Sequence, residues 1–483
     1  MNTVKLLIDG QMRDAVDQKT FTRMNPITGE VATVAAAAQP ADVQAAIESA
    51  EKAFPIWSKL GPTERRKRLL KAADLMDQRA QEFVLTARQE TGSTNSWYGF
   101  NVHLSANILR EAAAMTTQID GSIIPSDLPG SLSMGFRVPC GVILSIAPWN
   151  APVILATRAI AMPLACGNTV ILKASELCPA TQTLIGEVLN DAGIGAGVVN
   201  VITNAPEDAP AVVEQLIAHP AVKRVNFTGS TKVGRIIAGT AAKYLKPVLL
   251  ELGGKAPVIV CEDADLDQAV EGVAFGAFFN QGQICMSTER LLVHQNIADA
   301  FLEKLVAKIQ RIKVGSPDLE DTTFAYLESP QSVQRITALV EDAVSKGATL
   351  PVPLQTDGAL MHPLIVNGIT PDMKLYAEES FGPVATMTTF ASDEEAIRLA
   401  NDTVYGLSAA VFTQNINKGL ELAKQIDSGI CHINGPTVHD EAQAPFGGSK
   451  DSGYGRFGSK SAINEFTEMR WVTIQTTPRQ YPI

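Results

Sequence analysis

The 483-residue sequence has few cysteines, few aromatic residues and no excess of positive charge. Six cysteines are too few for a disulfide scaffold, and none has the C-x-x-C spacing typical of zinc sites. With 40 Lys plus Arg and 51 Asp plus Glu, the net charge is −11, so we expect no binding to nucleic acid or anionic membranes. The six histidines are dispersed along the sequence, which predicts no metal site and no Ser-His-Asp triad.

Long uninterrupted hydrophobic runs are also absent. The apolar stretch 141–167 contains Arg158 and three prolines, which a membrane-spanning helix does not accommodate together. The first residues show neither the apolar run nor the cleavage site of a signal peptide. We therefore expect a cytoplasmic protein. The 46% hydrophobic content supplies a large core, and the length predicts roughly three structural units.

The order of apolar patterns predicts the fold class. Residues 40–116 have the helical spacing of apolar residues. Two series of short β-branched runs follow, with helical segments between them. A parallel sheet covered by helices has this alternation, so we expect two Rossmann-like α/β domains. The expected strands lie in 141–148, 168–175, 198–204 and 224–230 for the first series, and in 256–262, 289–295, 362–369, 382–390, 405–413 and 428–435 for the second.

Several polar residues follow the expected strands, where open α/β sheets bind ligands. The segment 229–234 either presents a helix N-terminus to a phosphate or forms a tight turn. Lys173 and Glu176 either hold ribose hydroxyls or form an exposed ion pair. Asn150 either donates to an oxyanion or caps a turn between two prolines.

Cys285 and Glu251 are candidates for the chemistry. Cys285 lies in the polar loop 280–287. Cys166, Cys261 and Cys431 lie in apolar runs that suit buried, inert thiols, and Cys140 and Cys178 flank prolines in turns. A nucleophilic thiol needs access and surroundings that favour the thiolate. Glu251 lies among leucines, where desolvation should raise its pKa and suit it to general-base catalysis. The alternative is a buried acid bonded to backbone amides.

Seven motifs occur in order over nearly the whole chain and together resemble the NAD(P)-dependent aldehyde dehydrogenase superfamily. They lie at residues 148–150, 171–176, 227–234, 250–255, 280–287, 378–384 and 445–457. The resemblance implies that Cys285 attacks the aldehyde to form a thiohemiacetal. Asn150 and the Cys285 N–H would hold the oxyanion, and Glu251 would activate the water that hydrolyses the thioester.

The resemblance also implies a cofactor site and a domain plan. NAD is expected, with NADP as the alternative, because the Glu176 carboxylate repels a 2′-phosphate. The implied cofactor residues are Trp149, Lys173, Glu176, Thr228, Gly229, Ser230, Gly234, Leu252, Glu379 and Phe381. The implied units are a dinucleotide-binding domain at 1–119 and 140–251, a catalytic domain at 252–449, and a small β oligomerisation domain at 120–139 and 450–483 that forms a homodimer or homotetramer.

Some positions depart from the family pattern. Phe457 replaces an acid that usually follows Gly-Arg, and Ala159 replaces a usual lysine. We therefore expect no second base and no proton relay there, which leaves Glu251 as the base. The segment 314–330 lacks a usual Gly-Pro, and a usual Gly-Gly is missing after residue 350. We expect that region to be peripheral.

The sequence looks most like the aromatic branch, which includes salicylaldehyde, vanillin and hydroxybenzaldehyde dehydrogenases. Ala151 leaves space for a ring where many aliphatic-aldehyde enzymes have a bulky aromatic residue. Arg158 would bind a ring hydroxyl or a carboxylate. Trp97 and Tyr98 form either an aromatic wall or part of the core. The expected substrate pocket contains Tyr98, Ala151, Arg158, Ile284, Met286 and Val438.

Three other functions remain as alternatives. A semialdehyde dehydrogenase for substrates such as succinic semialdehyde would use Arg158 to bind the substrate carboxylate. A CoA-acylating relative would lack the general base, so Glu251 argues against it. A non-enzymatic binding role is disfavoured because Cys285, Glu251 and Asn150 occur together.

Overall fold

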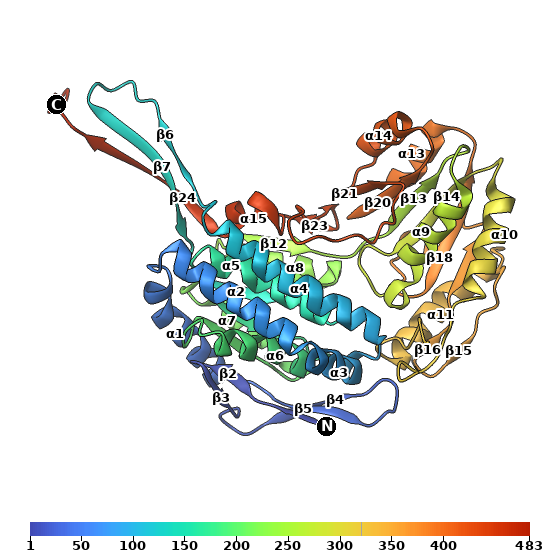
Figure 1. Ribbon diagram of the computed structural model, residues 1–483, viewed down its shortest axis with the longest axis horizontal. Helices are drawn as coiled ribbons and strands as arrows, with labels where there is room; N and C mark the ends of the chain where they lie inside the picture. The colour runs from blue at the N-terminus through green and yellow to red at the C-terminus, as the bar shows by residue number, and fades with distance from the viewer. Residues whose placement is uncertain (320) are drawn as a thin grey trace.

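The computed structural model describes residues 1–319 and 321–483 (Figure 1). Residues 40–116, which we predicted to be helical, form four helices. Helix α1 begins at Pro40 with a capping box between Gln39 and Asp42, which satisfies backbone donors at its start. Within the described ranges, no helix is both long and apolar enough to cross a membrane. The four helices are α1 (Pro40–Trp57), α2 (Pro62–Gln78), α3 (Ala80–Thr91) and α4 (Asn95–Met115).

The first large sheet has eight strands in the order β23-β12-β11-β8-β9-β10-β2-β3. Its five central strands are parallel, which confirms the first predicted α/β series. They are β8 (Val142–Ile146), β9 (Thr169–Lys173), β10 (Val199–Ile202), β11 (Val222–Thr228) and β12 (Val248–Glu251). The edge strands β2 (Leu6–Ile8), β3 (Gln11–Arg13) and β23 (Gly453–Tyr454) are antiparallel.

Helices connect the parallel strands and cover the sheet. All fourteen residues of α5 are buried, as expected for a helix that is apolar on every side. Strands β8 and β9 are buried on both faces, which explains their continuous apolar sequences. The connecting helices are α5 (Pro152–Ala165), α6 (Pro179–Asp191), α7 (Ala209–Ala218), which follows the 3-10 turn η1 (Pro206–Asp208), and α8 (Thr231–Lys243).

The strand register places several expected site residues at one edge of this sheet. Ile146 lies opposite Lys173 and Phe227, while Thr228 lies opposite Glu251. The strand order reverses between β8 and β11, and open α/β sheets bind ligands at such a switch point. The residues that follow β8, β9, β11 and β12 therefore surround one crevice.

The second large sheet has six parallel strands in the order β17-β18-β14-β13-β20-β21, as the second series predicted. Its strands are β13 (Ala256–Val260), β14 (Thr288–His294), β17 (Leu364–Asn367), β18 (Val384–Phe390), β20 (Ser408–Phe412) and β21 (Ile430–Ile433). Its helices are α9 (Leu266–Phe278), α10 (Ala298–Ile309), α11 (Pro330–Ser345), α12 (Lys374–Ala377), α13 (Asp393–Asn401) and α14 (Ile416–Gln425), and the 3-10 turn η2 (Phe279–Gly282) follows α9. Two short ladders accompany it, β15 (Thr356–Asp357) with β16 (Leu360–Met361) and β19 (Tyr405–Gly406) with β22 (Ser449–Lys450).

A third sheet projects from the body of the molecule together with the C-terminus (Figure 1). It contains β6 (Gly121–Ile124), β7 (Ser131–Pro139) and β24 (Thr467–Gln475), all antiparallel. The expectation that all of 450–483 belongs to this unit is wrong. Strand β23 pairs with β12, and Phe457 and Phe466, which flank helix α15 (Ser459–Glu465), pack in the core of the first sheet.

The N-terminal segment forms strands that we did not predict from the sequence. Strands β1 (Asn2–Val4), β4 (Thr20–Met24) and β5 (Val31–Ala36) make a separate small sheet. Strands of three to six residues contain too few side chains to show a clear alternation.

Candidate active site

The loop that carries Cys285 follows α9 and has a left-handed backbone. Asn280 and Gln281 have φ values of 49° and 58°, and Gly282 follows with φ 71°. A Cβ at Gly282 would lie 2.1 Å from the Gly382 carbonyl oxygen, so only glycine fits there. The Ser93 hydroxyl contacts the side-chain oxygens of Asn280 and Gln281 at 2.6 and 3.0 Å.

Asn150 is bonded directly to this loop. Its Nδ2 donates to the Gln283 carbonyl at 2.9 Å, and its own carbonyl accepts from Asn280 Nδ2 at 3.1 Å. The Trp97 indole N–H donates to the same Asn150 carbonyl at 3.0 Å. An amide nitrogen carries two hydrogens, so Asn150 retains one donor for a substrate oxygen.

The segment 314–330 is not peripheral throughout. The Glu328 backbone N–H donates to Gln283 Oε1 at 3.0 Å, two residues before Cys285 in the sequence. Glu320 in the same segment lies outside the described residues. The end of this segment therefore supports the nucleophile loop, contrary to our expectation.

Glu251 ends strand β12 and is 3% exposed. Neither carboxylate oxygen has a hydrogen-bond partner in the described part of the chain. Burial raises the pKa of Glu251 to about 8, against the opposing effect of Arg158 and Arg456. A Cβ at Gly447 would lie 2.8 Å from Glu251 Oε1, so this glycine makes space for the carboxylate. The Gly448 backbone N–H lowers the pKa of Glu251 but does not reach hydrogen-bond geometry, so the structure favours a free acid over the bonded-acid alternative.

Burial also raises the pKa of the Cys285 thiol, and the nearby acids Glu251 and Glu379 raise it further. Arg158 acts in the opposite direction. The resting thiol is therefore protonated and needs a base, and Glu251 is an acid of raised pKa beside it. The Cys285 carbonyl lies against Gly254, where a Cβ would approach it to 2.2 Å. The Gly253–Gly254 pair thus lets β12 and the nucleophile loop approach each other.

Lys173 and Glu176 form an ion pair after β9. The pair is not the exposed one that we considered, because Lys173 is 5% exposed. Glu176 Oε1 also accepts from Asn204 Nδ2 at 3.0 Å, a contact that the sequence did not indicate. Two donors therefore fix the Glu176 carboxylate at the edge of the sheet.

Gly229, Ser230 and Gly234 form the start of α8. Ser230 Oγ caps the helix by accepting from Val233 N at 3.4 Å, and Gly229 N donates to the Glu251 carbonyl at 2.9 Å. A Cβ at Gly234 would lie 2.4 Å from Leu252 Cδ2, so glycine lets the helix pack closely on that residue. Thr228 precedes this turn and lies opposite Glu251 in the sheet. The free N–H groups of the first turn suit an anionic group.

Glu379 and Phe381 come from the second domain and face the first. Glu379 Oε1 accepts from Gly254 N at 2.8 Å. Burial, with a contribution from Glu289, raises the pKa of Glu379 to about 7. The Phe381 ring meets the Trp149 ring edge-on, with 5.8 Å between centroids.

These residues fit a nicotinamide dinucleotide. The Lys173–Glu176 pair offers hydrogen bonds to one ribose, the start of α8 offers amides to phosphates, and Glu379 offers a carboxylate to a second ribose. Asn204 Oδ1, beside Glu176, is buried and has no partner among the described residues. It is an acceptor available to a ligand hydroxyl.

The substrate side of Cys285 is apolar. Ala151, Ile284, Met286 and Val438 belong to one buried cluster, and Cys285 packs against it. Tyr98 belongs to the same cluster, and its hydroxyl contacts Thr91 Oγ1 at 2.5 Å and accepts from Ser93 N at 3.0 Å. Its hydroxyl is thus bonded within residues 91–98, and its place in the substrate pocket stays a prediction.

Trp97, rather than Tyr98, has the aromatic position next to Asn150. Its ring meets Phe279 edge-on at 5.1 Å, and Phe279 stacks on Phe275 at 4.7 Å. Successive side chains of a helix are rotated by about 100°, so Trp97 and Tyr98 point in different directions although both are buried. An aromatic wall therefore joins α4 to the nucleophile loop.

Arg158 borders this pocket but is already paired. Its Nη2 lies 2.7 and 2.6 Å from the two carboxylate oxygens of Asp440, and the guanidinium lies 4.5 Å from the Phe446 ring centroid. This pairing disfavours the alternative in which Arg158 binds a substrate carboxylate. Its Nη1 is buried without a partner in the described ranges and remains available for one hydrogen bond.

Two histidines that are apart in the sequence lie together in the structure. The rings of His432 and His439 are 5.0 Å apart, and His439 Nε2 lies 2.9 Å from Glu441. The expected dispersion of the histidines is therefore wrong for this pair. Across the described residues, no three His, Cys, Asp or Glu side chains form a group suited to a metal ion.

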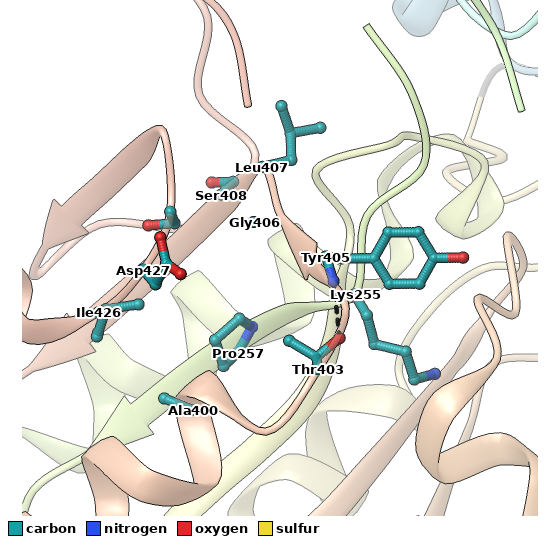
Figure 2. A pocket seen from close by; sticks show the side chains of 11 residues that line it. Lys255, Pro257, Ala400, Thr403, Tyr405, Gly406, Leu407, Ser408, Ile426 and Asp427 are labelled. Atoms are coloured by element: carbon teal, nitrogen blue, oxygen red, sulfur yellow. Dashed lines mark hydrogen bonds between the residues drawn. The ribbon is translucent and has the colours of Figure 1, made fainter. Parts of the chain in front are cut away.

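Two small cavities lie near the site. One is lined by Lys255 and Tyr405, among other residues (Figure 2). None of its lining residues was expected to act in catalysis or cofactor binding. The other reaches Arg158 from the side of α4 and is lined in part by Glu111, Glu441 and Met162. Glu111 and Glu441 make the electrostatic potential negative where a ligand would approach Arg158 through this second cavity.

Comparisons with known proteins agree with this geometry. Residues 13–472 match the model of the "Aldehyde dehydrogenase family". The chain belongs to the aldehyde dehydrogenase family. It is 60% identical over 480 residues to a vanillin dehydrogenase of Pseudomonas sp. strain HR199, with 99% of each chain covered. The crystal structure of salicylaldehyde dehydrogenase from Pseudomonas putida G7 complexed with salicylaldehyde has a TM-score of 0.98 and 48% identity over 100% of both chains.

A third relative concerns the cofactor. The crystal structure of PnpE in complex with nicotinamide adenine dinucleotide has a TM-score of 0.95 and 36% identity, covering 99% of each chain. Aldehyde dehydrogenases use NAD or NADP. The family and the aromatic branch expected from the motifs are thus confirmed.

The two substituted positions among these departures, Phe457 and Ala159, have only structural contacts. The Phe457 ring is 1% exposed in the apolar core. The Ala159 carbonyl accepts from Ser145 Oγ and Asn226 Nδ2 at 2.8 and 3.1 Å. Neither position offers a titratable side chain, so Glu251 remains the candidate base.

Proposed function

We propose that this aldehyde dehydrogenase oxidises an aromatic aldehyde of the benzaldehyde, salicylaldehyde, vanillin or hydroxybenzaldehyde type to its carboxylic acid. The observation that carries the proposal is the buried apolar cluster against which Cys285 packs, with Ala151 beside Asn150 and the Trp97–Phe279 aromatic pair next to them. The relatives named for vanillin and salicylaldehyde support the same substrate class.

The proposed reaction uses Cys285, Asn150 and Glu251. Glu251 accepts the thiol proton, and the thiolate attacks the aldehyde carbon to form a thiohemiacetal. The free N–H of the Asn150 amide and the Cys285 backbone N–H donate to the oxyanion. A bound nicotinamide dinucleotide supplies the acceptor for the hydride that this carbon loses. Glu251 then releases its first proton to solvent and takes a proton from water, and the resulting hydroxide attacks the thioester carbon. The C–S bond breaks, Cys285 regains a proton and the acid is released.

The Arg158–Asp440 pair favours neutral rings over carboxylated aldehydes. A semialdehyde needs an unpaired cation, but Asp440 already neutralises Arg158 and Glu441 lies close by. A ring hydroxyl needs only one hydrogen bond, for which Arg158 Nη1 is available. We therefore place the aromatic aldehydes ahead of succinic semialdehyde.

The test is NAD⁺ reduction with equal low concentrations of benzaldehyde, salicylaldehyde, 4-hydroxybenzaldehyde, vanillin, hexanal and succinic semialdehyde. We expect larger specificity constants for the ring aldehydes. A preference for succinic semialdehyde would refute the proposed substrate class. Cys285→Ala serves as the control for the chemistry, because it should abolish oxidation of every aldehyde.

We propose NAD as the preferred cofactor. Glu176 is held by Lys173 and Asn204, so its carboxylate cannot easily turn away from a 2′-phosphate. Comparing the specificity constants for NAD and NADP tests this, and a preference for NADP would contradict it.

We also propose that the chain forms a homodimer or homotetramer through the projecting sheet. Ile123 and Trp471 on this sheet are 77% and 72% exposed, which supports burial by a second copy. Mass measurement in solution, with Trp471→Glu for comparison, tests this assembly. All six cysteines are free, which supports a cytoplasmic location.

A further inference from the structure

Lys255 and Glu289 form a buried ion pair between the two halves of the site. Lys255 Nζ lies 2.5 Å from Glu289 Oε2, and their side chains are 0% and 4% exposed. Lys255 follows the Gly253–Gly254 pair, while Glu289 lies in β14, four residues after Cys285. Burying two charges is costly unless their geometry and remaining hydrogen bonds are good, so the other contacts of the pair matter.

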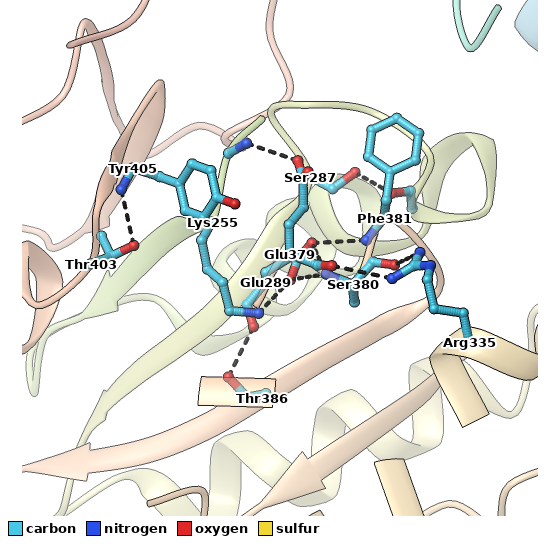
Figure 3. A network of polar contacts seen from close by, with 12 residues as sticks. Lys255, Ser287, Glu289, Arg335, Glu379, Ser380, Phe381, Thr386, Thr403 and Tyr405 are labelled. Carbon is cyan, nitrogen blue, oxygen red and sulfur yellow. Dashed lines mark hydrogen bonds and ion pairs between the residues drawn. The ribbon is translucent and has the colours of Figure 1, made fainter. Parts of the chain in front are cut away.

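Glu289 uses its remaining acceptor capacity on one loop. Its two oxygens each accept from Ser380 N at 2.9 Å, and Oε1 also accepts from Phe381 N at 3.1 Å. Figure 3 shows Lys255 approaching this carboxylate from one side and Ser380 and Phe381 from the other. The carboxylate thus joins a fixed cation to two successive backbone amides.

The loop needs such support because its backbone is strained. Phe381 has φ 47°, a left-handed conformation that is costly for a residue with an aromatic side chain. The Phe381 N–H bond to Glu289 and the edge-on contact with Trp149 oppose relaxation. Without the acceptor, two buried amides would lose their partner and the loop would be free to relax.

Three further bonds give the loop its orientation. From the side of α11, Arg335 donates to the Ser380 carbonyl at 2.6 Å through Nη2 and to the Glu379 carbonyl at 3.4 Å through Nη1. Gly254 N donates to Glu379 Oε1 at 2.8 Å, which joins Glu379 to the residue that precedes Lys255. The same segment therefore contacts both the loop's acid and the ion pair.

We propose that Lys255 and Glu289 are positioning residues for the cofactor half of the site. They hold Glu379 and Phe381 in the geometry that receives the nicotinamide ribose, and neither touches the substrate. This inference rests on the proposed role of Glu379 at that ribose.

The test replaces the pair without leaving a buried charge. In the variant Lys255→Met/Glu289→Leu, apolar side chains of similar size occupy the site, so we expect the protein to fold. The amides of Ser380 and Phe381 then have no acceptor. We expect the calorimetric Kd and the KM for NAD⁺ to rise about 10-fold or more, while kcat and the KM for the aldehyde change about 3-fold or less. An unchanged Kd for NAD⁺ in the folded variant would overturn the proposal.

Two single variants separate positioning from general stability. Glu289→Gln keeps one carbonyl acceptor for the amides, so its Kd for NAD⁺ should lie between those of the wild type and Glu289→Ala. Arg290→Met is the matched control, because Arg290 is buried on the same strand but donates to the carbonyls of Leu399 and Ala400. If Arg290→Met weakened NAD⁺ binding as much as Glu289→Ala, a merely structural role would explain the effect.

Glu379→Gln distinguishes failure of this inference from failure of the proposed cofactor site. If Glu379→Gln leaves the Kd for NAD⁺ unchanged, the role of Glu379 at the ribose is wrong. If Glu379→Gln weakens binding but the Lys255→Met/Glu289→Leu variant does not, only the positioning role is wrong. Alkylation of Cys285 by iodoacetamide should proceed at the wild-type rate in the double variant, because the thiol surroundings are retained.

Discussion

Glu251 and Glu289 are both 3% exposed, but their carboxylates have opposite surroundings. Glu289 accepts from an ammonium group and two backbone amides. Glu251 has no hydrogen-bond partner among the described residues, although Arg158 and Arg456 lie near enough to affect its pKa. A carboxylate that accepts several hydrogen bonds is held in one position, whereas burial without such bonds disfavours the charged form and raises the pKa of Glu251. Two equally buried carboxylates therefore have different proposed roles. Glu289 positions a loop, whereas Glu251 is the candidate base.

The largest expected effect is that of Glu251→Gln. The amide keeps the shape of the side chain but cannot accept a proton, so kcat should fall roughly 10²- to 10⁴-fold. The Kd for NAD⁺ should change little, the reverse of the expectation for Glu289. Steady-state kinetics and calorimetry on both variants check this contrast. Similar losses of kcat in Glu251→Gln and Glu289→Gln would remove the distinction between the two acids.

Gly447→Ala should have an intermediate effect. The added Cβ would lie 2.6 Å from both Arg456 Cδ and the Gly455 carbonyl oxygen and 2.8 Å from Glu251 Oε1, so it would displace Arg456 and the carboxylate without changing any charge. We expect kcat to fall about 10-fold, because overpacking typically costs about 1–3 kcal/mol. Gly239→Ala is the control, since a Cβ there meets no atom within 4 Å. Equal kinetics in the two variants would contradict the close packing of Gly447 on Glu251.

The buried Glu251 carboxyl should also make the free energy of unfolding depend on pH. Because burial raises the pKa of Glu251 to about 8 in the folded state, its contribution is present at low pH and is lost as pH rises through that value. The free energy of unfolding of the wild type should therefore fall relative to Glu251→Gln between pH 6 and 8, by on the order of 1 kcal/mol per pH unit. Denaturant unfolding of both proteins at several pH values tests this, and parallel curves would exclude a raised pKa.

The smallest expected effect is that of Asp440→Asn. The Asp440 charge raises the pKa of Glu251 and Arg158 lowers it, so removing the carboxylate should lower the pKa by a fraction of a unit. The pH–rate profile should shift toward acid, and the unpaired Arg158 should improve turnover of succinic semialdehyde relative to benzaldehyde. A shift toward alkaline pH would show that Arg158 does not act on Glu251.

Much of this fold was predictable because the central strands of a parallel sheet are apolar on both faces. The strand residues 142–146 and 169–173 therefore read as continuous apolar runs. The two-residue strand Gly453–Tyr454 gives no such signal, because its place depends on pairing with β12 about 200 positions earlier. The boundary at residue 450 was wrong for that reason.

Residues of the candidate site were predictable where each of them lies in a short sequence motif of its own. Cys285, Glu251 and Asn150 each lie in such a motif, and the structure brings their segments together. The residues that form ion pairs with Arg158 and Lys255 were not predictable. Asp440 is 282 positions from Arg158, and Glu289 is 34 positions from Lys255. In the sequence these four residues look like ordinary charges, because only the fold shows which of them are buried and paired.

The most direct test is the pH dependence of kcat/KM for the wild type, Glu251→Gln and Glu289→Gln with one aromatic aldehyde. A base must be deprotonated to act, so wild-type activity should rise with pH and level off above an inflection near pH 8. Glu289→Gln should keep this inflection and Glu251→Gln should lose it. If Glu251→Gln retained the inflection, the titrating base would be another group, and the contrast between the free and the bonded carboxylate would not explain the chemistry.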